Sequence, residues 1–194
     1  MATQTEQMPA IVRRSGTTII AAGVLWLAAL GLAIAADVLE ATSGTFDGTE
    51  ETLWGIMTVA IVTAGLLTVA GLAGLRRDLV MGRAGMVGLI LAGLGTAFGV
   101  VAWAFPIWGG LLGIGMLIFS LALIRQGQAP RWATISFGFG MLTGIAIFFL
   151  LDLLKVGSIN SYGDYPVAGN IGAAVMLTTS ALGSIGVGRW FNTR

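Results

Sequence analysis

The sequence predicts an all-α protein, a polytopic transmembrane bundle of six helices. Hydrophobic residues make up 56% of the 194 positions and charged residues only 10%, too little charge to cover a soluble domain of this size. The apolar residues form six stretches, each close to the roughly 20 helical residues that cross a hydrocarbon core. The arginines gather on one side of these stretches. Together these observations predict a membrane protein with both ends on the same side.

The first stretch, residues 17–39, follows Arg13-Arg14 and contains Ala33-Ile34-Ala35. The basic pair, the apolar run and this small-residue motif together imitate a signal peptide with its cleavage site. We interpret it as a retained first span. The second, residues 53–75, begins after an acidic loop rich in Thr and Gly and ends at Arg76-Arg77. Cations are favoured at the C-terminal end of a helix, so this boundary is typical of a helix end.

The third and fourth stretches, residues 84–105 and 107–124, are separated only by a turn around Pro106. We therefore expect tightly antiparallel neighbours. The fifth and sixth, residues 133–154 and 167–187, each follow a proline, which suits the first turn of a helix, where its missing N–H would be unpaired anyway. The predicted organisation is a segment 1–16, a transmembrane domain 17–188 and a tail 189–194.

The charges predict the orientation. Nine of the ten basic residues fall on one side of the six stretches, and seven of the nine acidic residues fall on the other. The basic residues on the first side are Arg13, Arg14, Arg76, Arg77, Arg83, Arg125, Arg131, Arg189 and Arg194. Because cytoplasmic loops carry the excess of Lys and Arg, both termini are predicted to be cytoplasmic.

Several kinds of chemistry are disfavoured by what the sequence lacks. It contains no cysteine and no histidine, so imidazole-ligated haem, iron–sulfur clusters and the usual zinc site are excluded, as are thiol catalysis and histidine proton relays. No stretch has a charge at its centre, which argues against a proton pump or a voltage sensor. We expect no cofactor, no bound metal, no nucleic-acid partner and no enzymatic activity.

A candidate ligand or ion site is predicted on the acidic side. Asp37 and Asp152 each close a hydrophobic stretch, where a carboxylate would face the unfavourable negative end of a helix dipole. Residues placed against a local structural preference in this way are enriched at functional sites. The other candidates are the neighbouring Lys155, Asn160, Tyr162, Asp164 and Tyr165. The alternative is that these side chains are solvated at the headgroups.

Glycine patterning predicts close helix packing. Of the 30 glycines, three pairs are spaced four residues apart inside the hydrophobic stretches: Gly95 and Gly99, Gly109 and Gly113, and Gly140 and Gly144. Such spacing lets helix backbones approach in lipid. It indicates either packing within this bundle or association with a partner chain or a second copy.

Two short segments carry a resemblance. The cytoplasmic stretch from Leu123 to Trp132, ending Pro130-Arg131-Trp132, and the run from Ala21 to Leu27 resemble bacterial multi-span membrane families of unknown function. The composition, rich in Ala, Gly and Val, is similar to that of proteins from high-GC bacteria. The resemblance implies a six-span protein of the bacterial plasma membrane and implies no activity.

The function favoured by the sequence is therefore a non-enzymatic integral membrane protein that acts through helix packing in the lipid bilayer. It would be an accessory or assembly subunit, or a homo-oligomer. The alternative is a small-solute transporter or a substrate-binding membrane subunit that uses the acidic site. Ala21, Ala28 and Ala35 in the first stretch are similar in spacing to a contact surface of the substrate-binding subunits of energy-coupling-factor vitamin importers.

Overall fold

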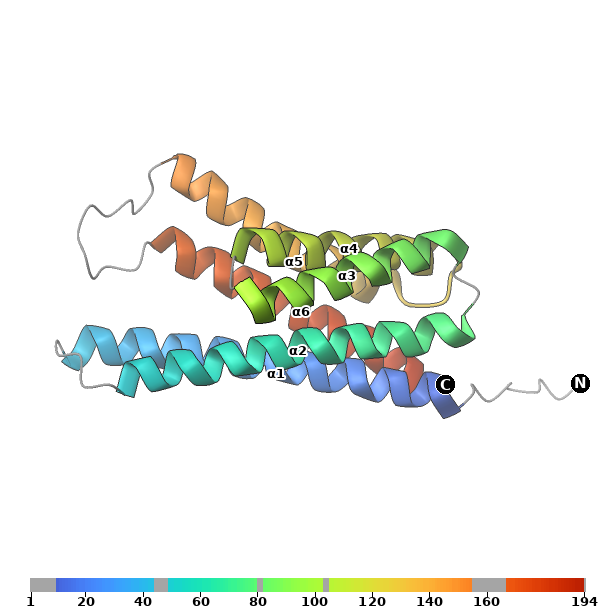
Figure 1. Cartoon of the computed structure of the whole chain (residues 1–194), viewed down its shortest axis with the longest axis horizontal. Coiled ribbons are helices and arrows are strands. Elements are labelled where there is room, and N and C mark those ends of the chain that lie inside the picture. The colour runs from blue at the N-terminus through green and yellow to red at the C-terminus, as the bar shows by residue number, and fades with distance from the viewer. Residues whose placement is uncertain (1–9, 44–48, 80–81, 103–104, 155–166, 194) are drawn as a thin grey trace, which may run out of the picture.

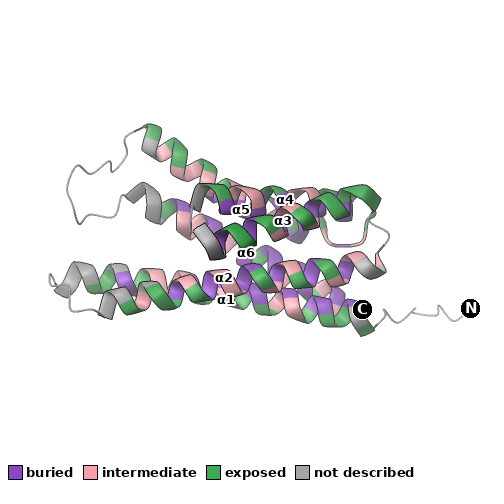
Figure 2. Ribbon diagram, viewed as in Figure 1, coloured by how far each residue is buried: buried purple, intermediate pink, exposed green. Residues whose placement is uncertain are grey.

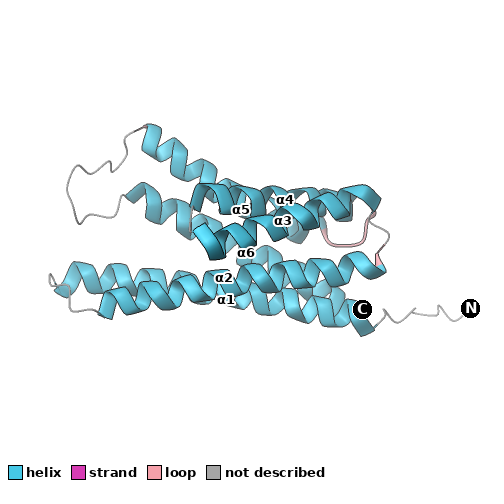
Figure 3. Cartoon of the chain, in the orientation of Figure 1, coloured by secondary structure: helices cyan, strands magenta, loops and turns pink. Residues whose placement is uncertain are grey.

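The structure, a computed structural model, describes residues 10–43, 49–79, 82–102, 105–154 and 167–193. Some side chains within these ranges, including those of Asp37 and Asp152, lie outside the description. All regular structure in the described ranges is helical (Figure 1, Figure 3). The helices are α1 (Ala10–Ser43), α2 (Thr49–Asp78), α3 (Gly82–Ala102), α4 (Phe105–Arg125), α5 (Arg131–Leu153) and α6 (Val167–Asn192).

The predicted fold class is confirmed, because each expected stretch coincides with one helix that is long and apolar enough to cross a membrane. Most helix ends extend beyond the hydrophobic stretches, although α3 ends at Ala102 and α5 at Leu153, short of the expected limits of 105 and 154. For example, α1 begins at Ala10 and continues past Asp37 to Ser43. A helix satisfies its own backbone hydrogen bonds, so it has no need to stop where lipid gives way to polar surroundings. Hydropathy therefore marks the depth of the lipid and not the end of the helix.

The six helices form a ring. Around the bundle the order is α2, α1, α6, α5, α4, α3, and the ring closes between α3 and α2, which make the smallest of these contacts. The first turns of α1 meet the last turns of α6, where Thr17 Oγ1 donates a hydrogen bond of 3.2 Å to Asn192 Oδ1. Toward the other end of the bundle α1 and α6 diverge, while α6 stays beside α5 (Figure 1).

The turn between α4 and α5 is closed by a glycine. Gly127 has a φ of 63°, a left-handed conformation that is cheap only for glycine. Its N–H donates to Ile124 O at 3.1 Å, and the N–H of Gln128 donates to Leu123 O at 3.3 Å. This is a Schellman ending. It satisfies the last carbonyls of α4 and returns the chain at once into α5.

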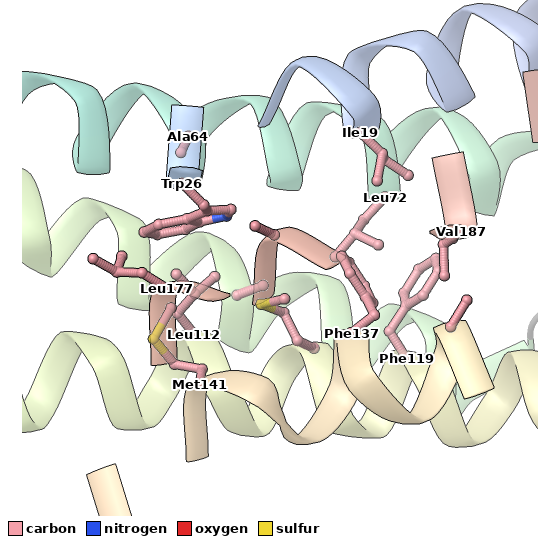
Figure 4. Packing of buried hydrophobic residues seen from close by; sticks show 14 of the residues in the cluster. Ile19, Trp26, Ala64, Leu72, Leu112, Phe119, Phe137, Met141, Leu177 and Val187 are labelled. Atoms are coloured by element: carbon pink, nitrogen blue, oxygen red, sulfur yellow. The ribbon is translucent and has the colours of Figure 1, made fainter. Parts of the chain in front are cut away.

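Side chains fill the interior where the helices meet. Trp26, Phe119 and Phe137, from α1, α4 and α5, are fully buried, and Figure 4 shows them packed among aliphatic and methionine side chains. The outer surface is also apolar. Val59 is 66% exposed and Leu153 is 77% exposed, and exposed residues lie along every helix (Figure 2). An apolar exterior of this kind suits lipid and is rare on soluble proteins.

Threonines inside the helices bond to their own backbone. The hydroxyls of Thr63, Thr68 and Thr96 each donate to the carbonyl four residues earlier, at 2.7, 2.8 and 3.0 Å, and Thr179 does the same. This is the usual way for a hydroxyl to be satisfied within a membrane helix. These polar residues therefore need no water-filled channel to explain them.

Candidate functional site

The predicted acidic site is carried by helices that do not converge. Asp37 lies in α1 and Asp152 in α5, and α6 packs against both of these helices. The ends of α1 and α5 that carry the two residues lie apart (Figure 1). Lys155, Asn160, Tyr162, Asp164 and Tyr165 are outside the described residues. A ligand or ion site at these positions stays a prediction.

Five of the six paired glycines lie at contacts between helices of this chain. We describe each contact by the atoms that a Cβ would meet if one were added to the glycine. At Gly140 a Cβ would lie 2.7 Å from Ser180 N, and at Gly113 it would lie 2.8 Å from Leu142 Cδ2. At Gly95 it would meet the backbone of α4, and at Gly144 that of α6. Gly99 is less crowded, since a Cβ there would be 3.5 Å from the ring of Trp108, and Gly109 is buried.

Further glycines in close contact were missed by counting four-residue spacings. Gly16 lies against Gly188, Gly74 against Ser15, and Gly183 against Phe137. A spacing of seven residues, two helical turns, was a signal that would have found Gly16, but no glycine lies seven residues from Gly74 or Gly183. It relates Gly16 to Gly23 and Gly88 to Gly95, and all four are in close contact with a neighbouring helix. A residue repeated at this spacing stays on one face of a helix.

A crevice with room for about one water molecule lies between α2, α3 and α4. It is lined by Ile61, Val62, Gly65, Thr96, Gly99, Trp108 and Leu112. The lining is largely apolar, and the hydroxyl of Thr96 already bonds to its own helix. Sites that enclose small molecules usually occupy about 300–1,000 Å³. The crevice is smaller than such a site, and it lies at the weakest seam of the ring.

Buried polar atoms are scattered through the interior. Trp26 Nε1 and the hydroxyls of Ser120, Ser180 and Ser184 are buried without a hydrogen-bond partner. Ser120 lies against Gly138 and Ser180 against Gly140, and positions two residues apart point to opposite sides of a helix such as α5. The two hydroxyls therefore do not form one polar site. Among the described residues no group of three or more His, Cys, Asp or Glu could hold a metal ion.

The other end of the bundle is basic. We call it the arginine end, where Arg13, Arg14, Arg125, Arg131 and Arg189 are all exposed. Here α1 and α5 begin and α4 and α6 end. One tryptophan links α6 to the α4–α5 turn, and another links the first turn of α5 to α6. Trp190 Nε1 donates to Gln128 O at 2.6 Å, and the ring of Trp132 lies over Gly186, where a Cβ would be 2.7 Å from the ring edge.

Comparison of the chain with protein-family models, with curated proteins and with solved structures finds no match in any of the three. The class of this protein therefore follows from its own features. Six apolar helices, an apolar exterior and charges kept near the helix ends define a multi-pass membrane protein.

Proposed function

We propose that this chain is a non-enzymatic subunit of the bacterial plasma membrane that acts by packing against another membrane helix, in a partner protein or in a second copy. Both of its termini would be cytoplasmic, an orientation supported by the sidedness of the arginines. The proposal has two supports: how the interior is filled, and what one outer face presents.

The filled interior favours a role at the outer surface of the bundle over passage of a solute through its centre. Fully buried side chains from five helices occupy the middle of the ring, with Trp26, Leu72, Phe119, Phe137 and Leu177 as examples. Helical bundles that handle a solute place its site between helices, often near the bilayer midplane. In the described part of the chain the crevice at the α2–α3 seam is too small for this role.

The main support for the proposal is the outer face of α1. Six exposed residues follow one another at alternating spacings of three and four, and all of them are small or β-branched. They are Ala21, Val24, Ala28, Gly31, Ala35 and Val38. This is the repeat with which one helix packs along another, and small side chains are what allow close approach in lipid. A Cβ on Gly31 would meet nothing within 4 Å, so the face is open at Gly31.

Cysteine crosslinking tests the proposal directly, because the natural chain has no cysteine and so no background. Ala28→Cys, in native membranes with a mild oxidant, is expected to give a disulfide-linked dimer or a link to a cysteine of one partner. Ala146→Cys is the matched control, since Ala146 is also an exposed alanine, on α5. A chain that stays monomeric with both variants, and purifies without a companion under mild solubilisation, would refute the proposal.

The alternative, solute transport through an outward acidic site, depends on Asp37 and Asp152. The support for it is the sequence position of these two residues. We therefore place it second.

A further inference from the structure

We propose that the α3–α4 hairpin swings away from α2 and opens the ring to the lipid, pivoting at the arginine end. The contact between α2 and α3, which we call the seam, is then a lateral gate between the bilayer and the interior of the ring. This inference goes beyond the role in helix packing. Because it concerns other helices, it stands or falls independently of the α1 face.

The α3–α4 hairpin is the most loosely attached part of the ring. Its two helices pack closely on each other, since a Cβ added to Gly88 would lie 2.8 Å from Gly115 O. The two smallest contacts around the ring, α2–α3 and α4–α5, are the ones that join this hairpin to the other four helices. The hairpin can therefore move as one body.

Side chains, and not backbones, close the seam at the two glycines that face it. A Cβ added to Gly65 would lie 3.3 Å from the side chain of Thr96. A Cβ added to Gly93 would lie 4.0 Å from Val69 Cγ1. By contrast, α1 and α6 meet backbone to backbone at the glycines between them. Separation of α2 from α3 at these positions therefore breaks only side-chain contacts.

Movement of α3 withdraws no large, fully buried side chain from the interior. The buried residues of α3 are small: Gly85, Gly88, Ala92, Gly95, Thr96 and Gly99. Its exposed large side chains are Met86, Val87, Ile90, Leu94 and Phe98 (Figure 2). Lipid tails are as apolar as these surfaces, so opening the seam to lipid carries no hydrophobic penalty and costs only the lost packing contacts.

The pivot lies at the arginine end, where both connections to the hairpin are found. There α2 ends at Asp78 and α3 begins at Gly82, and α4 ends at Arg125 and α5 begins at Arg131. A glycine with a left-handed backbone is present at each connection, Gly82 with a φ of 58° and Gly127 with a φ of 63°. Hinges are formed by a few residues at the ends of elements, and glycine has the widest choice of φ and ψ. The opposite end of the hairpin is its own α3–α4 turn, so the seam opens toward that end.

The crevice lies in the part of the seam that the pivot would open widest. Its lining includes Val62, Thr96, Gly99, Trp108 and Leu112, and the two residues from α3 are in the half of that helix farther from the arginine end. The hydroxyl of Thr96 already donates to its own helix at 3.0 Å, so the widened crevice presents apolar surface. Alkyl chains of the surrounding lipid fill it, because an empty gap would forfeit contacts on both sides.

Distances between pairs of spin labels, measured by double electron–electron resonance on the full chain in lipid nanodiscs, test the proposal. The natural chain has no cysteine, so only the introduced pairs are labelled. Val59→Cys with Phe98→Cys places exposed labels across the seam, far from the pivot. This far pair is expected to show a second distance longer by about 4 Å, roughly one layer of carbon atoms in van der Waals contact. Ala73→Cys with Met86→Cys, also exposed but near the pivot, is expected to show one distance.

The matched control is Phe139→Cys with Leu182→Cys, an exposed pair across the α5–α6 contact, which is expected to give one narrow distance. A single narrow distance at the far pair would overturn the gate. Equal lengthening at the near pair would overturn the pivot, and equal lengthening at the control pair would show general loosening of the bundle and would also overturn the gate. If the far pair fails to fold, Leu66→Cys with Leu94→Cys, exposed residues midway along the seam, must show the longer distance instead.

The closed position of the seam can be tested separately. The Cβ atoms of Gly65→Cys and Thr96→Cys would lie 3.8 Å apart, within the range of about 3.5–4.5 Å for a disulfide. Mild oxidation in membranes is therefore expected to link the two cysteines within one chain. A double variant that folds and forms no disulfide would show that the seam does not close in this way, and would overturn the proposal.

Discussion

Replacing Gly183 by alanine would test whether direct backbone contact holds α6 against α5. A Cβ at this position would lie 2.6 Å from Ser136 C and would also meet the backbone N and Cα of Phe137. Ordinary van der Waals contact begins near 3.4 Å. The opposing atoms are backbone, so no side-chain rotation can relieve the clash, and the helices must separate by at least the difference of 0.8 Å, because the two Phe137 atoms are nearer still.

A gap of 0.5–1 Å forfeits roughly a quarter to a half of each affected contact. Overpacking of a well-packed interface costs about 1–3 kcal/mol. At about 2–4 °C per kcal/mol for a chain of this length, the apparent melting temperature should fall by about 2–12 °C. The assay is thermal unfolding of the purified protein in one detergent, followed by fluorescence-detected size exclusion.

Two glycines serve as controls in the same assay. Gly55→Ala adds the same methyl group where nothing lies within 4 Å, and Gly99→Ala adds it at 3.5 Å from the ring of Trp108. Both are expected to leave the melting temperature unchanged or slightly higher, because alanine favours the helix by up to about 1 kcal/mol. If Gly183→Ala proved as stable as Gly55→Ala, the reasoning from backbone contact would be wrong.

Two other predictions follow from the interior and from the charges. Ser184→Ala removes a buried hydroxyl without a partner, so the free energy of unfolding, measured by chemical denaturation, should stay the same or rise by about 1 kcal/mol. A decrease of that size would reveal an unseen partner such as water. Gln126→Cys places a single thiol at the exposed start of the α4–α5 turn, and a membrane-impermeant maleimide should label it only after the cells are broken. Labelling in intact cells would reverse the predicted orientation.

The glycine contacts change where an external partner should be sought. Four-residue glycine spacing alone leaves open whether a helix packs inside its own bundle or against another chain. Gly95, Gly113, Gly140 and Gly144 all lie against helices of this chain, so these faces are occupied. The exposed small-residue face is on α1, where valine and alanine provide most of the repeat, so glycine counting does not reveal it.

The sequence by itself determined the fold class, the number of helices and their approximate limits. It could do so because lipid imposes a composition and a length on any segment that crosses it. The position of the arginines at the helix ends could also be predicted from the sequence, because a charged side chain is costly to bury in lipid.

Only the tertiary structure decided which faces of those helices meet. Nearly every face of a membrane helix is apolar, so hydropathy cannot separate the side that packs on a neighbour from the side that meets lipid. The ring order and the divergence of the ends of α1 and α5 that carry Asp37 and Asp152 both depend on contacts between residues distant in sequence. Such contacts are set by the shape of interlocking side chains and backbones.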